Sequence, residues 1–136
     1  MAGGIMASQF NVPQSHLLIW NCSVSNQSVL WRDSTNSTRN LSVRNSAFQS
    51  MLDSYSNLSQ PTVLIDTNHF VSGRVYGAHA TTGAAGWLDP LNTWDLHPTP
   101  ESVLRDRVTT LLAPTDAAGA QCGIPAAIGA FQPVSR

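Results

Sequence analysis

Short apolar runs alternate with clusters of Ser, Asn and Asp along residues 17–76. The runs lack the 3.6-residue period of an amphipathic helix, so they predict β-strands. They also repeat, because the run 17–24 can be aligned with 41–48 and then with 63–70, at offsets of 24 and 22 residues. A weaker apolar run follows each copy, at 29–31, 51–52 and 75–76. A further short strand is expected around residues 5–10.

A repeat of this length predicts stacked coils, because one unit is too short to enclose a core by itself. Each strand then pairs with its copy in the next coil. Asn after the strand suits a left-handed corner, and Gly73 and Gly77 suit the corners of the third coil. Alternation along the first strand of each coil places these residues inside: Leu17, Ile19, Leu41, Val43, Val63 and Ile65. It places three residues outside, in one column: Trp20, Arg44 and Asp66.

The repeat is not visible beyond Gly77, so we divide the single domain into a lead-in at 1–16, coils at 17–77, and a cap and tail at 78–136. The cap is expected to cover the C-terminal end of the stack. Within it, residues 87–94 are expected to form a folded-over loop or a fourth, irregular coil. Thr99 as N-cap and Pro100 at the first helical position predict a short helix over 100–112. A last strand is expected at 127–131.

The rung pattern Leu-x-[Ile/Val]-x-Asn-x-x-[Phe/Val] at 17–24 and 41–48, looser at 63–70, resembles the rungs of pectate-lyase-like proteins. Segments 96–106 and 127–132 resemble the closing segment of many bacterial secreted β-helix proteins. The resemblance implies an all-β fold, a short right-handed parallel β-helix of three to four coils with an irregular, partly helical C-terminal cap. It also implies an extracellular or cell-surface location, although the N-terminus lacks a signal-peptide pattern. No catalytic motif of the lyases is recognisable.

Charged residues make up only 11% of the chain, and all seven basic residues are arginine. A helical bundle that needs Glu and Lys on its faces is therefore not expected. A net charge of −1 without a basic patch argues against nucleic acid as a partner. No apolar stretch of about 18 residues exists, so no membrane-spanning helix is expected. Low charge suits stacked coils, because like charges in a ladder repel across about 4.8 Å.

The outward column of Trp20, Arg44 and Asp66 is the first candidate binding site. The indole ring can stack on a sugar, while the two charged groups bond its hydroxyls. The alternative is an Arg–Asp pair that only decorates the sheet. Trp87 and Trp94 form a second candidate, as an aromatic platform for a ligand or as a cover for the open edge of the core.

Neither a metal site nor a cofactor is predicted. The histidines have no metal-ligand spacing, and surface or turn positions are expected for them: His16, His69, His79 and His97. Cys22 and Cys122 fit two separate thiols, although a disulfide between them stays open. Asp89 before Pro90 is expected to form a turn.

Three functions stay open from the sequence. The first is a non-catalytic module that binds carbohydrate or serves assembly through the outer face of its strands. The second is a reduced polysaccharide lyase or glycoside hydrolase that acts through Arg44 and Asp66. The third is a purely structural protein from a mobile or environmental open reading frame. Because the N-terminal end of the stack has only 1–16 to cover it, self-association through that end is also expected.

Overall fold

The computed structural model describes residues 6–8, 16–32, 40–53 and 63–133 of the chain, and these form an all-β fold without helices. No helix long and apolar enough to cross a membrane occurs in these ranges. One sheet contains β1 (Met6–Ser8), β3 (Ser23–Arg32), β5 (Ala47–Asp53), β7 (His69–Phe70) and β8 (Thr81–Thr82). A second contains β2 (His16–Trp20), β4 (Asn40–Arg44) and β6 (Val63–Asp66).

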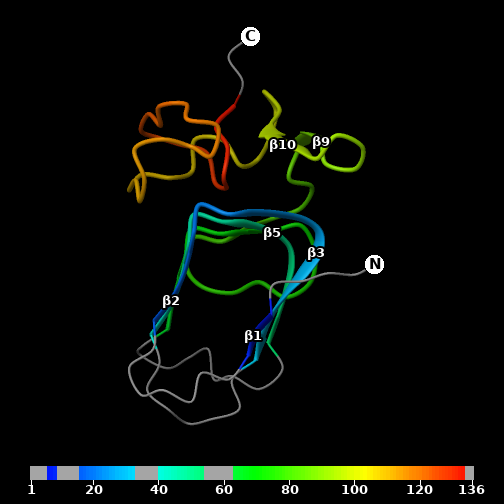
Figure 1. The fold of residues 1–136 in the computed structure, drawn as a ribbon, viewed down its shortest axis with the longest axis vertical. Coiled ribbons are helices and arrows are strands. Elements are labelled where there is room, and N and C mark those ends of the chain that lie inside the picture. The colour runs from blue at the N-terminus through cyan, green and yellow to red at the C-terminus, as the bar shows by residue number, and fades with distance from the viewer. Residues whose placement is uncertain (1–5, 9–15, 33–39, 54–62, 134–136) are drawn as a thin grey trace.

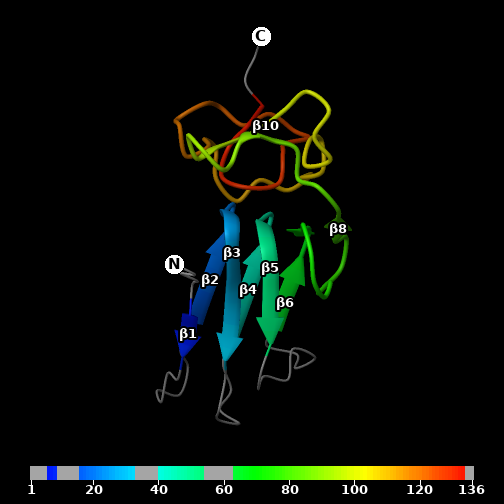
Figure 2. The ribbon, with the colours of Figure 1, turned by 90° about the vertical axis from the view of Figure 1, so that its right-hand side faces the viewer.

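All neighbouring strands in these two sheets are parallel, and each pairs with its counterpart from the next repeat. Figure 1 looks along the stack, so the strands of successive repeats overlap, whereas Figure 2 shows them side by side. Leu17 pairs with Leu41, and Leu41 pairs with Val63. The alignment of the three runs is therefore confirmed as the strand register.

The change of offset from 24 to 22 residues has a local cause in β3. Val24 is paired with Phe48, but Ser28 is paired with Ser50, so two extra residues lie between these pairs. This irregularity is a β-bulge, in which surplus residues of one strand bend out of the ladder. The first repeat is thus longer without disturbing the register on either side.

The core lies between the two sheets, as the alternation predicts. Ile19, Val43 and Ile65 are buried, each with an exposed fraction of 8% or less. Beside them, the rings of Phe48 and Phe70 stack at 5.9 Å, and Tyr76 meets Phe70 edge-on. The other three residues predicted inside lie outside the set whose side chains are described: Leu17, Leu41 and Val63.

A left-handed corner joins the second sheet to the first in every repeat. Asn21, Asn45, Thr67 and His79 occupy equivalent positions, with φ of 50°, 52°, 53° and 51°. The two asparagines confirm the predicted corner, since Asn tolerates this conformation better than most residues. Backbone hydrogen bonds run from each corner to the next, from Asn21 to Arg44, from Asn45 to Asp66 and from Thr67 to Ala78.

A polar ladder follows the corner inside the fold. The N–H of Cys22 donates to Ser46 Oγ at 3.1 Å, and the N–H of Ser46 donates to Asn68 Oδ1 at 2.9 Å. The Asn68 amide donates to the carbonyl of Val43 at 2.8 Å. Each side chain therefore binds a backbone group of the preceding repeat, which satisfies buried polar atoms that would otherwise destabilise the fold.

His69 is fully buried next to this ladder, contrary to the expected surface position. Its Nε2–H donates to the carbonyl of Gly83, which can only accept, and its Nδ1 lies beside the hydroxyl of Thr81, both at 2.9 Å. In the neutral ring, which burial favours, Nδ1 accepts from this hydroxyl. Burial lowers the pKa of His69 below its ordinary value of 6.5, although the bond to Gly83 opposes the shift.

The pairing continues beyond Gly77, where the sequence predicts the repeats to end. Asp66 forms a bridge with Ala78, and β8 pairs with β7. At the other end, β1 pairs with the far part of β3, so a segment of the predicted lead-in belongs to the sheet. The described part of the chain thus extends the repeat in both directions.

The tail, residues 84–133, lies across the strand ends at the corner and not over the C-terminal end of the stack (Figure 2). It begins with an antiparallel hairpin of β9 (Trp87–Asp89) and β10 (Asp95–Pro98). The remainder is irregular, with bonds from Ile128 to Leu104 and from Gly129 to Asn45. A small apolar cluster joins the tail to the corner: Ala47, Ala85, Leu104, Val108, Ala126 and Ile128.

The helix predicted over 100–112 is wrong, and so is the partly helical cap. Asp106 has a φ of 57°, which a right-handed helix excludes. The backbone groups of this segment bond elsewhere, since the N–H groups of Arg107 and Val108 both donate to Ala126. The strand predicted at 127–131 is wrong as well, because the structure holds only an isolated bridge at Ala126.

The buried neutral His69 predicts that acid destabilises the fold. Above pH 6.5 neither state binds the proton. Below pH 6.5 the unfolded chain takes up a proton that the folded chain resists, so the free energy of unfolding falls by up to about 1.4 kcal/mol per pH unit for this group. Urea unfolding from pH 7.5 to 5 measures this slope.

The His69→Gln variant is expected to be less stable at neutral pH and to lose this part of the slope. The substitution His79→Gln is the control for the removal of a histidine, and because His79 is mostly exposed it should reduce the stability at neutral pH by less than His69→Gln does. A native stability that does not change between pH 7.5 and 5 would contradict the prediction.

Candidate functional site

The predicted outward column is formed. Trp20 pairs with Arg44 and Arg44 pairs with Asp66 in the parallel register. Trp20 is exposed, and its Nε1–H donates to Ser42 Oγ at 2.9 Å, so the ring lies along the outer face of the sheet. The three residues therefore share one face, at the end of their strands next to the corner.

A cavity of about 390 Å³ lies between this end of the sheet and the tail. The corner of the repeats forms one wall, and residues 107–110 of the tail contribute the other. All the residues that line it carry polar side chains: Arg44, Asn45, Asp66, Thr67, His79, Arg107, Thr109 and Thr110. The cavity thus contains Arg44 and Asp66 from the predicted site, but not Trp20.

Asp66 is held by a histidine and not by Arg44. The distance from His79 Nδ1 to Asp66 Oδ1 is 2.7 Å, and the His79 side chain is 78% exposed. Within the described ranges, no salt bridge joins Asp66 to Arg44. The expected Arg–Asp pair is therefore replaced by a carboxylate–imidazole pair, whose second ring nitrogen can meet a ligand.

The tail wall is fixed to the corner by backbone and side-chain bonds. Asn45 donates its amide Nδ2 to the carbonyl of Thr110 at 3.2 Å. Gly129 donates its N–H to the carbonyl of Asn45, and Ala130 donates its N–H to Ser23 Oγ at 2.9 Å. Because Asn45 receives one bond and makes another, this corner residue positions two segments of the tail, one at Thr110 and one at Gly129.

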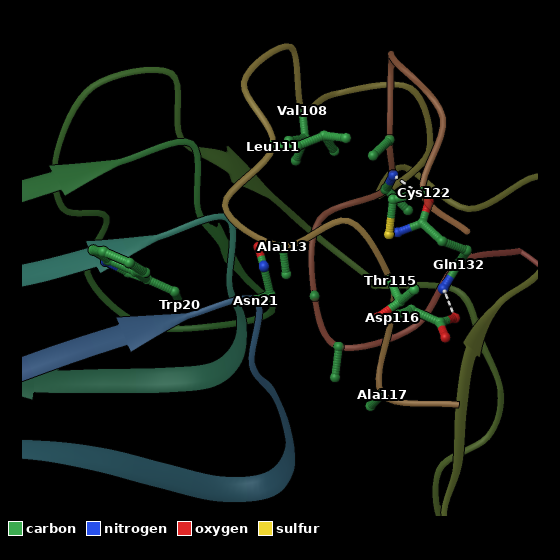
Figure 3. Close-up of a pocket in the computed structure, with 14 residues that line it drawn as sticks. Trp20, Asn21, Val108, Leu111, Ala113, Thr115, Asp116, Ala117, Cys122 and Gln132 are labelled. Atoms are coloured by element: carbon green, nitrogen blue, oxygen red, sulfur yellow. Dashed lines mark hydrogen bonds between the residues drawn. The ribbon is translucent and has the colours of Figure 1, made fainter. Parts of the chain in front are cut away.

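Trp20 belongs to a second, smaller cavity of about 250 Å³ (Figure 3). Its lining is mostly apolar, with Val108, Leu111 and several alanines, and it also includes Asn21 and Cys122. Burial and the charge of the nearby Asp116 raise the pKa of the Cys122 thiol. The Asp116 carboxylate in this cavity already accepts hydrogen bonds from the tail. The cavity therefore has no charged group among its described residues that is free to bind a polar ligand.

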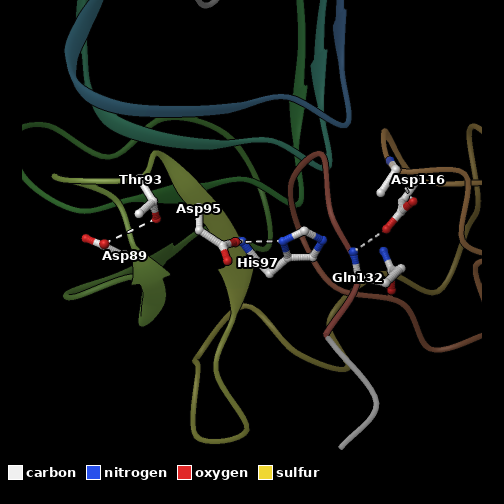
Figure 4. Close-up of polar contacts among 7 residues, drawn as sticks. Asp89, Thr93, Asp95, His97, Asp116 and Gln132 are labelled. Carbon is white, nitrogen blue, oxygen red and sulfur yellow. Dashed lines mark hydrogen bonds and ion pairs between the residues drawn. The ribbon is translucent and has the colours of Figure 1, made fainter.

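Asp116 holds the end of the chain in place. Its Oδ2 accepts from the N–H of Gln132, and its Oδ1 accepts from those of Ala118 and Ala120 (Figure 4). Desolvation opposes ionisation, but these donors hold the pKa of the Asp116 carboxyl below its usual value. The role of Asp116 is therefore structural.

The hairpin of the tail contains two further ordered carboxylates. Asp95 accepts from the backbone N–H and ring Nδ1 of His97, which lowers its pKa (Figure 4). Asp89 accepts from Asn92 and Thr93, and its pKa is lowered first by the backbone N–H of Asn92. The turn predicted at Asp89 is thus confirmed.

Trp87 and Trp94 do not form one platform. Trp87 packs against the apolar cluster of the tail, and its buried Nε1 has no partner within the described part of the chain. Trp94 is 63% exposed at the hairpin turn, with a φ of 59°. The first residue therefore covers a core edge, as one alternative predicts, and the second contacts no aromatic ring of the described residues.

The two cysteines are free thiols, so the structure holds no Cys22–Cys122 disulfide. The Cys22 thiol donates to the carbonyl of Trp20, and burial raises its pKa. In the described ranges no three His, Cys, Asp or Glu side chains gather in the way a metal ion needs. His16 lies outside the set whose side chains are described.

Six of the eight residues that line the polar cavity were not predicted as site residues, and the repeat locates only two of these, Asn45 and Thr67. His79 follows the series of corner positions 21, 45 and 67, but the last repeat is shortened, so no constant offset reveals it. Arg107, Thr109 and Thr110 belong to the irregular tail, where no period indicates which residues face the corner. Only contacts made after folding bring them to Arg44 and Asp66.

The docking of the tail depends on Gly129. We predict that substitutions of Gly129 and Ser23 are energetically coupled. Gly129 has a φ of 110°, and an added Cβ would overlap Ser23 Oγ. Gly129→Ala is expected to cost about 1–3 kcal/mol in backbone strain and more from the overlap. Ser23→Ala loses the bond to Ala130, about 0.5–1.5 kcal/mol, but removes the overlapping atom.

The double variant should therefore be destabilised by less than the sum of the single variants, with a coupling of about 1 kcal/mol in urea unfolding. Gly119→Ala is the control, because Gly119 has a φ of 85° but nothing within 4 Å of an added Cβ. The destabilisation caused by Gly119→Ala should add to that caused by Ser23→Ala. Additive effects of Gly129→Ala and Ser23→Ala would contradict the docking described above.

The chain matches no family model, no curated protein and no solved structure. Its resemblance to the pectate-lyase-like proteins rests on the rung pattern and the closing segment, and it stays a prediction.

Proposed function

We propose that the chain is a short right-handed parallel β-helix module that binds a carbohydrate-like ligand without acting on it. The parallel register of β2, β4 and β6, and of β3, β5 and β7, supports the helical arrangement of repeats. Equivalent left-handed corners in successive repeats support it as well. The resemblance in the rung pattern points the same way, and it adds an extracellular or cell-surface location to the proposal.

The polar lining of the larger cavity carries the functional part of the proposal. Its volume of about 390 Å³ falls within the range of ligand sites, and every residue that lines it carries a polar side chain, whereas most such sites are lined by apolar residues. Sugar hydroxyls both donate and accept hydrogen bonds. Arginine supplies donors, aspartate supplies acceptors, and threonine supplies both. A polyhydroxylated ligand is therefore the class that this lining matches best.

Binding fits the lining better than catalysis does. Most enzymes that hydrolyse a glycosidic bond use two carboxyl groups, and Asp66 is the only carboxylate among the described residues that line the cavity. Arg44, the other predicted catalytic residue, supplies hydrogen-bond donors but no acceptor. The lyase alternative would thus depend on the Asp66–His79 pair. Release of unsaturated sugars by the native chain, lost in Asp66→Asn, would establish that alternative.

Loss of one hydroxyl from the cavity is expected to weaken binding. Glycan-array screening of the native chain identifies a bound oligosaccharide, and titration calorimetry then gives its dissociation constant. Thr109→Val should raise that constant about three- to tenfold, the effect of one lost hydrogen bond. Thr82→Val is the matched control, since Thr82 is exposed but lies on β8 outside the cavity. Absence of binding to every glycan would overturn the proposal.

Self-association through the N-terminal end of the stack is the second role that an observation favours. In the described part of the chain, β2 is the outermost strand of its sheet, and it contains no Asp, Glu or Arg. Leu18 on this strand is 53% exposed. A free edge without charged residues promotes pairing between chains.

We therefore expect sedimentation velocity to show dimers or larger species at micromolar concentration that dissociate on dilution. Leu18→Lys should shift the equilibrium toward monomer, because it introduces charge at the free edge. Leu64→Lys is the control, since Leu64 is similarly exposed but lies on β6, away from this edge. A single monomeric species throughout would contradict the expectation.

A further inference from the structure

The charges that line the larger cavity do not balance. Arg44 and Arg107 contribute two guanidinium groups, and Asp66 contributes the single carboxylate. That carboxylate is already engaged by His79 at 2.7 Å. The cavity therefore carries an excess of positive charge in a chain whose overall net charge is −1.

Arg44 is the less solvated of the two cations. It is half-buried on the central strand β4, and its Nε is buried without a hydrogen-bond partner in the described structure. No salt bridge to Arg44 forms within the described ranges. Removal of a cation from water without a counterion is unfavourable, so an anion that enters the cavity would offset part of this cost.

Arg107 approaches from the tail on the other wall. Its Nε donates to the carbonyl of Val103 at 3.3 Å, which anchors the planar group at one side. The side chain is otherwise exposed, and it lines the cavity. Its terminal nitrogens are therefore able to bind a ligand without the loss of the bond to Val103.

We propose that the cavity recognises a ligand that carries an oxyanion, a phosphate, sulfate or carboxylate group, bound by Arg44 and Arg107. A guanidinium group matches such an oxyanion through two parallel charge-assisted hydrogen bonds. Thr67 and Thr109 then remain for neutral hydroxyls, since the Asn45 amide already holds Thr110. The inference rests on the proposed function for the rest of the ligand, but the oxyanion site itself can be tested separately.

The first experiment compares matched probes on the full chain. Glucose, glucose 6-phosphate, glucose 6-sulfate and glucuronate are titrated by calorimetry, together with inorganic phosphate, sulfate and acetate. We expect at least one charged sugar to bind about tenfold or more tightly than glucose. The three charged sugars show which oxyanion is preferred, and the inorganic ions show whether the sugar contributes.

The second experiment replaces each arginine by glutamine, which removes the positive charge and keeps a shorter polar side chain. Arg44→Gln and Arg107→Gln should each abolish the preference for the charged sugar over glucose. Arg74→Gln is the charge-matched control, because Arg74 stacks on Tyr76 and lies outside the cavity. Arg107 is exposed, so its variant keeps the test valid if Arg44→Gln reduces folding, which circular dichroism would reveal.

The outcomes separate this inference from the proposed function. Equal binding of glucose and its charged forms overturns the oxyanion site and leaves the binding of polyhydroxylated ligands intact. A second outcome is that inorganic ions bind as tightly as the charged sugars while glucose does not bind. This outcome overturns the proposed function and supports the oxyanion site. An equal loss in Arg74→Gln overturns the site, because it shows an effect of overall charge. Absence of all binding overturns both.

Discussion

The left-handed turn at the corner is the constraint on which the rest of this structure depends. Four residues of successive repeats share nearly the same φ, and their backbone groups bond from one repeat to the next. Because every repeat turns at the same place, the strands on both sides remain in register. The corner also separates two environments. Arg44 and Asp66, just before it, face outward, while Ser46 and Asn68, just after it, point inward.

The sequence predicts those parts of the structure that depend on period and alternation. The register from Leu17 to Val63, the buried Ile19 and the column with Arg44 follow from a two-residue strand period and a repeated unit. The tail follows different rules. Local signals at Thr99 indicate a helix, but the N–H groups that a helix would use are bonded to Ala126, which lies far away in the sequence. Only tertiary contact decides between these two bonding patterns.

The candidate site, like the fold, was predictable only where its residues belong to the repeat. Arg44 and Asp66 belong to the repeat, so their proximity follows from the register. His79 occupies the next corner, but only twelve positions after Thr67, and this shortening hides it from a search at constant offset. Arg107 reaches the cavity because Asn45 holds the neighbouring tail residues through the carbonyl of Thr110. The oxyanion site therefore combines one wall that a period specifies with one that tertiary bonding specifies.

His69 and His79 show how position relative to the corner separates stability from binding. His69 lies two positions after a corner, on the inward side, where its two nitrogens are satisfied by Thr81 and Gly83 and the ring stays neutral. His79 lies at a corner and is mostly exposed, with Asp66 as its partner at the cavity. A proton on the first ring would place a charge inside the fold, and burial disfavours this charge by lowering the pKa of His69. A ligand at His79 meets a side chain that does not stabilise the core. The site can therefore change while the stacked strands remain intact.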